Sequence, residues 1–107
     1  MTNFEGVIPT LSQALNKRGY IDLTPVQAAV LAPEVGAADL LVSAQTGSGK
    51  TVAFGISIAP TLLDSRERFD RDSFPLALVI APTRELALQV QRELEWLFAS
   101  ADAIVAS

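Results

Sequence analysis

Three short apolar runs, separated by stretches long enough for a helix, place the strongest limit on how this chain folds. The runs cover residues 40–42, 76–80 and 103–105. Apolar runs of this length without polar alternation are typical of strands that are buried on both faces. Strands that alternate with helices form parallel sheets. We therefore predict an α/β fold, with a parallel sheet covered by helices on both faces.

Four segments around these runs carry helix signals. Thr10 and Gln13 have the spacing of a capping box, and Gly19 marks the end of the helix that would follow. Thr24 and Gln27 repeat the pattern and predict a helix to about residue 31. Helical patterns also cover 50–63, where internal Gly and Pro residues favour an early end, and 84–99. Residues 65–73 are rich in charge and predict a solvated loop.

Composition excludes several classes of protein. Half of the 107 residues are apolar, which excludes a disordered chain. Because the chain has no Cys and no His, it has no disulfide, no thiolate nucleophile and no imidazole base. The 12 acidic and 8 basic residues give a net charge of −4, so contact with nucleic acid must rest on a few placed groups. No secretory signal or membrane span is evident, and we expect a cytoplasmic protein without a membrane partner.

A Gly-rich segment between the first apolar run and the next helix carries the chemistry. Its glycines let successive N–H groups converge on phosphate oxygens, and the helix end adds a positive dipole. Lys50 would reach the β and γ phosphates, and the Thr51 hydroxyl would ligate Mg²⁺. The alternative is a Gly-rich turn with an incidental Lys-Thr pair. The predicted loop consists of Ala44, Gln45, Thr46, Gly47, Ser48, Gly49, Lys50 and Thr51.

Three segments together resemble the DEAD-box ATP-dependent RNA helicases. AQTGSGKT at 44–51 resembles motif I, PTRELA at 82–87 resembles motif Ia, and GYIDLTPVQ at 19–27 resembles the Q motif. The resemblance implies a P-loop NTPase with a RecA-like parallel sheet. Residues 1–107 would form the N-terminal part of the first RecA-like domain, with a Q-motif region at 2–30. ATP and Mg²⁺ would be the cofactors and RNA the partner.

The resemblance also assigns roles to single residues. Gln27 would hydrogen-bond the adenine edge, because a carboxamide offers both a donor and an acceptor. Phe4 would stack on the adenine, and Tyr20 and Thr24 complete the predicted ATP site. Leu23 replaces the usual Pro. Without the neighbouring phosphate loop, Thr24 and Gln27 would be no more than a helix cap.

Motif Ia implies contacts with the RNA backbone. Thr83, Arg84 and the first N–H groups of the helix would hold a phosphate, with Pro82 and Glu85 in the same set. The alternative is a helix cap beside a solvated Arg-Glu pair. Trp96 on the same helix is expected to pack and not to stack on bases.

Several family motifs do not occur in these 107 residues. The Asp-Glu-Ala-Asp and Ser-Ala-Thr motifs are missing, as is the arginine finger of a second RecA-like domain. We therefore expect this truncated domain to bind nucleotide without hydrolysing it. Strands without their family neighbours would pair with another chain, rearrange, or leave the phosphate loop disordered. Two other interpretations are a DNA helicase of the same superfamily and a non-catalytic nucleotide-binding or assembly module.

Overall fold

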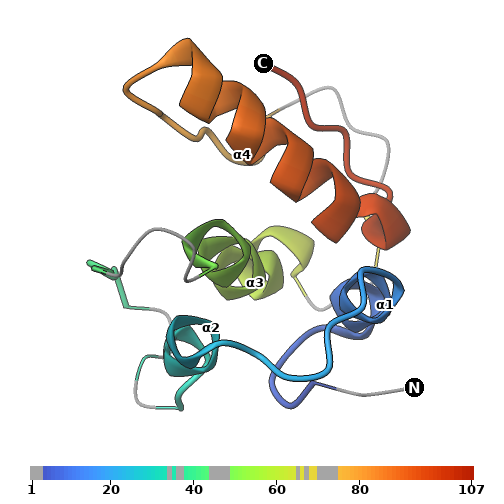
Figure 1. Cartoon of the computed structure of the whole chain (residues 1–107). Helices are drawn as coiled ribbons and strands as arrows, with labels where there is room; N and C mark the ends of the chain where they lie inside the picture. The colour runs from blue at the N-terminus through green and yellow to red at the C-terminus, as the bar shows by residue number, and fades with distance from the viewer. Residues whose placement is uncertain are drawn as a thin grey trace.

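The computed structural model describes residues 4–33, 35, 38–43, 49–64, 66, 68–69 and 75–107. In Figure 1, α3 lies at the centre of the molecule, and it contacts both α2 and α4. The helix α1 packs against α4 and the short helix η1. The helices are α1 (Pro9–Lys17), α2 (Pro25–Val30), α3 (Lys50–Leu63), α4 (Arg84–Leu97) and the 3-10 helix η1 (Ala99–Ala101).

The helix α1 begins two residues earlier than the sequence predicts. Its N-cap is Ile8, Pro9 occupies the first turn, and no side chain caps the end, so the prediction of a Thr10 capping box is wrong. Proline suits a first turn because its φ is already helical and it has no N–H to leave unpaired. Thr10 therefore lies inside the helix, where it is buried.

The predicted end of α1 at Gly19 is confirmed. The N–H of Gly19 donates to the Asn16 carbonyl at 3.1 Å, and the N–H of Tyr20 donates to the Leu15 carbonyl at 3.0 Å. Gly19 has a φ of +89°, the left-handed conformation that this type of helix end requires. The Leu15 and Asn16 carbonyls of α1 are thus paired within the turn.

The capping box predicted for α2 is present. The Thr24 N–H donates to the Gln27 side-chain oxygen at 3.0 Å, and the Gln27 N–H donates to the Thr24 hydroxyl at 3.4 Å. Pro25 occupies the first turn, and the helix ends at Val30, one residue from the predicted end. The local signals in this segment were sufficient to place the helix.

The longer helices α3 and α4 follow the predicted ranges closely. Pro60 does not end α3 early, because it lies in the last turn and only one helical N–H donor is lost. Gly55 permits close packing: a Cβ at this position would lie 2.5 Å from Leu97 Cδ2 on α4. The helix α4 is capped by Thr83, whose hydroxyl accepts from the Leu86 N–H at 3.1 Å.

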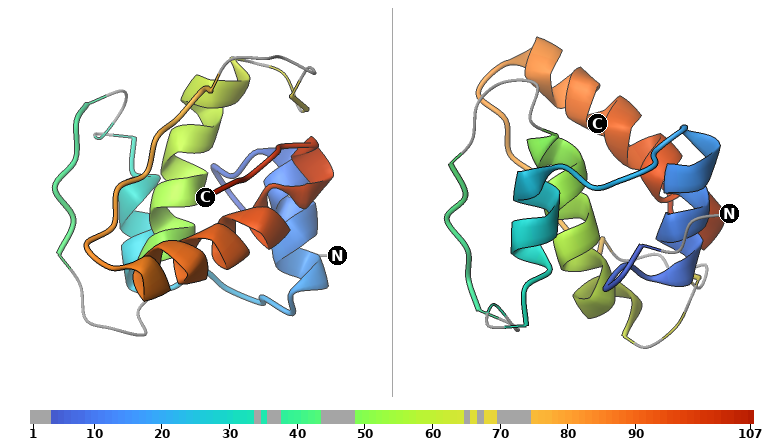
Figure 2. Two further views of the ribbon diagram at one scale, coloured as in Figure 1. Left: turned by 90° about the horizontal axis from the view of Figure 1, so that it is seen from above. Right: turned by 60° about the horizontal axis from the view of Figure 1, so that its bottom comes forward.

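The predicted strands do not form among the residues that the structure describes. Residues 40–42, 76–80 and 103–105 are all described, and none belongs to a helix or a strand. Figure 2 draws them as separate uncoiled traces. A strand is stable only where its N–H and C=O groups meet a neighbouring backbone, and these segments do not pair with one another. The predicted parallel sheet with helices on both faces is therefore not present in the described part of the chain.

The core lies between the helices. Its fully buried members include Leu11 and Leu15 of α1, Ile56 and Leu63 of α3, and Leu97 of α4. In α4, Val90 and Leu94 are also buried, as their spacing predicts. Phe98 is buried and Trp96 packs against the core, so the prediction that Trp96 is a packing residue agrees with its position.

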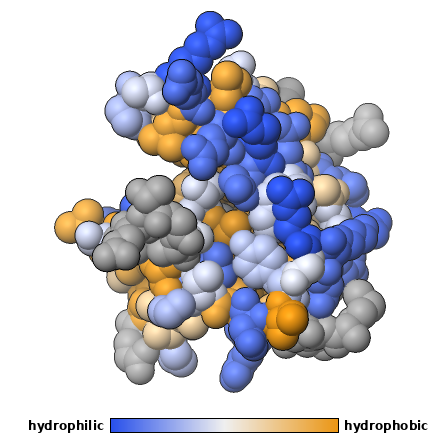
Figure 3. Space-filling view, viewed as in Figure 1, coloured by the Kyte–Doolittle hydropathy of each residue, from blue (hydrophilic) through white to orange (hydrophobic). Residues whose placement is uncertain are grey.

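The surface is larger than expected and includes large apolar side chains. The chain exposes 7667 Å², about a third more than the roughly 5,800 Å² expected for a folded monomer of this mass. Leu41 is fully exposed, and Leu78, Ile80 and Ile104 each expose more than four fifths of their area. Figure 3 shows apolar residues in orange at the surface between polar ones. The excess area is carried in part by the segments that the sequence predicts to be buried strands.

Candidate nucleotide-binding site

The predicted phosphate loop falls partly outside the described residues. Residues 44–48, which include the predicted Ala44, Gln45, Thr46, Gly47 and Ser48, are not described. The predictions for these five residues remain predictions. The described part of the loop consists of its last three residues, Gly49, Lys50 and Thr51.

Gly49 caps α3 in a conformation that only glycine adopts readily. Its φ is +84°, in the left-handed region. A Cβ at this position would collide with the Gln27 side-chain nitrogen and lie 3.4 Å from the Thr24 hydroxyl. Two independent reasons, backbone conformation and lack of space, therefore require glycine here.

Lys50 and Thr51 are the first two residues of α3. The first N–H groups of an α-helix have no carbonyl partner within the helix, and the dipole makes this end positive. Lys50 is exposed, Thr51 is half-buried, and the first turn contains no acidic residue. This arrangement of a cation, a hydroxyl and a helix N-terminus is suited to binding an anion.

Gln27 connects the predicted Q motif to the phosphate loop. Its side-chain nitrogen donates to the Gly49 carbonyl at 3.2 Å, while its side-chain oxygen accepts from the Thr24 N–H. The residue is completely buried. Each atom of a carboxamide has room for a second hydrogen bond, but a buried amide reaches a base only after the surrounding chain moves. The sequence predicts Gln27 in the site and gives no signal for the bond to Gly49.

The two predicted aromatic residues lie elsewhere. Phe4 is 6% exposed and belongs to the core, so stacking on adenine would require it to leave the core. Tyr20 contacts Trp96 of α4, with the ring centres 6.0 Å apart. Among the described residues, Thr24 and Gln27 of the Q motif lie beside Gly49 of the phosphate loop.

The predicted motif Ia residues lie at the N-terminal end of α4. Thr83 caps the helix with its hydroxyl, as the alternative interpretation of this segment has it, and Pro82, Arg84 and Glu85 are exposed. Figures 1 and 2 place the N-terminal ends of α3 and α4 on the same side of the molecule. The two predicted anion-binding helix ends therefore lie on one side of the molecule.

The described residues contain no cluster of three or more His, Cys, Asp or Glu side chains that could hold a metal ion. Mg²⁺ would have Thr51 as its only predicted ligand here. Within the same residues, no helix is both long and apolar enough to span a membrane.

Comparison with known proteins identifies the family. A family model described as DEAD/DEAH box helicase matches residues 24–107. The chain is 47% identical over 88 residues to DEAD-box ATP-dependent RNA helicase 9 of Oryza sativa subsp. japonica, covering 82% of this chain and 14% of that protein. It is 36% identical over 104 residues to DEAD-box ATP-dependent RNA helicase rde-12 of Caenorhabditis elegans, covering 94% and 11%. The chain belongs to the DEAD/DEAH box helicase family.

A solved structure supports the same assignment. The crystal structure of the RNA helicase Prp28 from Chaetomium thermophilum, bound to ADP, matches with a TM-score of 0.77 at 34% identity. The match covers 100% of this chain and 27% of that one. The chain thus shares the fold of part of a helicase RecA-like domain and spans about a seventh of the length of the rice relative.

Proposed function

We propose that this chain is the ATP-binding and RNA-contacting N-terminal part of an ATP-dependent RNA helicase, spanning the Q motif, the phosphate loop and motif Ia. The observation that carries the proposal is the hydrogen bond between Gln27 and the Gly49 carbonyl. It joins the predicted adenine-reading residue to the first turn of the predicted phosphate-binding helix. The RNA helicases among the similar proteins support the same choice.

In the proposed ATP site, different residues of the phosphate loop contact different parts of the nucleotide. Residues 44–49 wrap the phosphates with backbone N–H groups, Lys50 neutralises the β and γ phosphates, and Thr51 binds Mg²⁺. Gln27 reads adenine once its bond to Gly49 is exchanged for bonds to the base. RNA binds through its backbone at Thr83 and Arg84 at the N-terminal end of α4. This end lies on the same side of the molecule as the N-terminal end of α3.

In the whole protein, ATP binding and hydrolysis would drive the opening of RNA duplexes. The 107 residues contain no Asp-Glu-Ala-Asp motif, so we expect no turnover from this chain alone. A positioned catalytic base is worth roughly 10²–10⁴-fold in rate. The names of two relatives place them in mitochondria and chloroplasts, so the cytoplasmic location remains a prediction.

Calorimetry with Mg²⁺ and ATP tests the phosphate loop. We expect Lys50→Ala to weaken ATP binding about tenfold or more, because it removes a charge-assisted hydrogen bond. Arg92→Ala is the matched control, because it also removes an exposed cation, from the middle of α4. Equal ATP affinity in the parent chain and Lys50→Ala would remove the basis for the phosphate-binding role.

Competition between ATP and GTP tests the role of Gln27. We expect ATP to bind more tightly, because guanine has an acceptor where adenine has its amino donor. Gln27→Ala removes the side-chain oxygen that would accept from the adenine amino group, so the preference for ATP should disappear. If the parent chain binds GTP as tightly as ATP, Gln27 does not read the base and the non-catalytic module becomes the better interpretation.

A further inference from the structure

The end of α1 and the end of α4 bring a basic and an aromatic side chain together. The Arg18 guanidinium carbon lies 5.0 Å from the centre of the Trp96 ring, within the range of a cation–π interaction. The Trp96 ring nitrogen donates to the Glu93 carboxylate at 2.7 Å, which fixes the ring on its own helix. Tyr20 packs on the same ring. The result is an aromatic wall with a cation in front of it.

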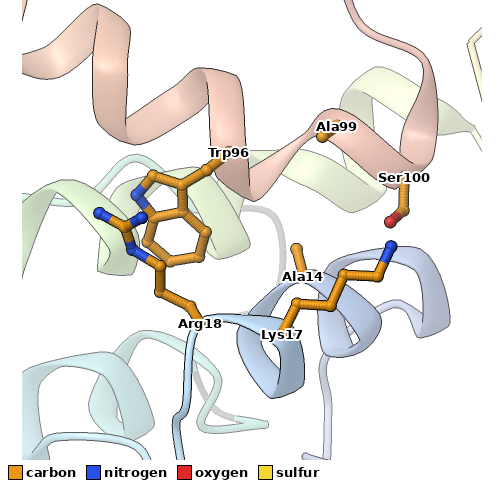
Figure 4. A pocket seen from close by; sticks show the side chains of 6 residues that line it. All are labelled: Ala14, Lys17, Arg18, Trp96, Ala99 and Ser100. Carbon is orange, nitrogen blue, oxygen red and sulfur yellow. The ribbon is translucent and has the colours of Figure 1, made fainter.

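A hollow of about 250 Å³ opens beside this wall. We call it the Arg18–Trp96 site. Figure 4 shows the side chains of Lys17 and Arg18 at its rim, with the small residues Ala14 and Ala99 leaving room between α1 and η1. The lining residues are Ala14, Lys17, Arg18, Trp96, Ala99 and Ser100.

The charges around the hollow favour an anion. Two of the chain's eight basic residues lie at its rim, and among the described residues no carboxylate lines it. The nearby Glu93 is already bonded to the Trp96 ring nitrogen. At the end of α1, the Leu15 and Asn16 carbonyls are paired with the N–H groups of Tyr20 and Gly19. This local positive charge contrasts with the net charge of −4 of the chain.

The size and the lining of the hollow favour a peptide as its occupant. The hollow is smaller than the roughly 300–1,000 Å³ of pockets that enclose drug-sized ligands, so it suits individual side chains of a longer segment. An aliphatic side chain would contact the Trp96 ring edge and Ala14, while a neighbouring carboxylate would contact Lys17 or Arg18. We propose that the Arg18–Trp96 site binds an acidic segment of a partner protein in which carboxylates alternate with aliphatic side chains.

Two observations argue against RNA as the occupant. Arg18 already covers one face of Trp96, so that face is closed to stacking with a base. The site also lies at the C-terminal end of α4, whereas the predicted RNA contacts lie at its N-terminal end. A helix of 14 residues separates these ends by about 21 Å.

Trp96 is the only tryptophan of the chain, so its fluorescence reports directly on this site. The probe is a short peptide of alternating leucine and aspartate, titrated into the full chain. We expect a saturable change in emission that weakens with added salt. Lys17→Gln and Arg18→Gln should each weaken binding about two- to fivefold, as expected for exposed ion pairs. Arg18→Lys, which keeps the charge, should bind more tightly than Arg18→Gln.

The controls separate charge from folding. Arg92→Gln removes an exposed cation elsewhere on α4 and should bind the peptide like the parent. Circular dichroism checks each variant for helix content, and Lys17→Gln keeps the test open if Arg18→Gln unfolds. Unchanged affinity in Lys17→Gln, or equal binding of a leucine–lysine peptide, would overturn the proposal. Saturation by oligouridylate without saturation by the acidic peptide would overturn it in favour of RNA.

Discussion

At the scale of single residues, Gly19 and Gly49 share a backbone conformation but differ in their surroundings. Their φ angles are +89° and +84°. A Cβ at Gly19 would meet nothing within 4 Å, whereas a Cβ at Gly49 would meet the Gln27 side chain. The pair therefore separates the cost of a left-handed backbone from the cost of losing the contact between the Q motif and the phosphate loop.

We predict that Gly19→Ala lowers the free energy of unfolding by about 1 kcal/mol, the cost of a left-handed residue with a Cβ. Gly49→Ala should lower it by about 1–3 kcal/mol more, because the new methyl group must displace Gln27. Urea denaturation measures both values. Equal losses in the two variants would show that Gln27 does not lie against Gly49 in solution.

At the scale of elements, the packing of α3 on α4 depends on Gly55. In an isolated helix, replacing a central glycine with alanine is stabilising by roughly 1 kcal/mol. Here the added Cβ would lie 2.5 Å from Leu97 Cδ2 and 3.3 Å from Leu94 Cδ2. Tertiary packing therefore opposes the intrinsic helix propensity at this position.

We predict that Gly55→Ala lowers the thermal midpoint, with a loss of about 1–3 kcal/mol from overpacking. Leu97→Ala alone leaves a cavity and should cost about 2–5 kcal/mol. The double variant should be more stable than the sum of the two losses predicts, because Leu97→Ala makes room for the new methyl group, which fills part of the cavity. Additive losses would show that the two helices do not meet at Gly55.

At the scale of the whole molecule, residues 39–43 and 75–80 make no backbone hydrogen bond with another part of the described chain. Leu41 and Leu78 on these segments are exposed almost completely. Exposed apolar segments in extended form are templates for pairing with another chain. We therefore expect two molecules to associate through these segments.

We predict that the 107-residue chain associates as its concentration rises, and that Leu41→Lys and Leu78→Lys reduce this association. A lysine on an exposed edge opposes strand pairing by charge and hydration. Sedimentation velocity measures the outcome, with Ile21→Lys as the control, because Ile21 is also exposed but lies outside these segments. A parent chain that stays monomeric at every concentration would contradict the prediction.

The sequence by itself determined the helices and the family. Thr24, Gly19 and Thr83 act on neighbours within five residues, so their signals are complete in a short stretch of chain. The error at Thr10 has the same origin: Pro9 competes locally for the first turn. The sequence motifs at 19–27, 44–51 and 82–87 were sufficient to indicate the helicase family, which the family model then confirmed.

Only the tertiary structure decided what depends on distant residues. The bond from Gln27 to Gly49 joins positions 22 residues apart, and Arg18 meets Trp96 across most of the chain. Neither pair leaves a periodic or local pattern in the sequence. The runs at 40–42 and 76–80 have the composition of buried strands, but a strand also needs a hydrogen-bonded neighbour, and composition cannot supply one. For that reason, the helices follow the local sequence closely, whereas the sheet does not form in the described residues.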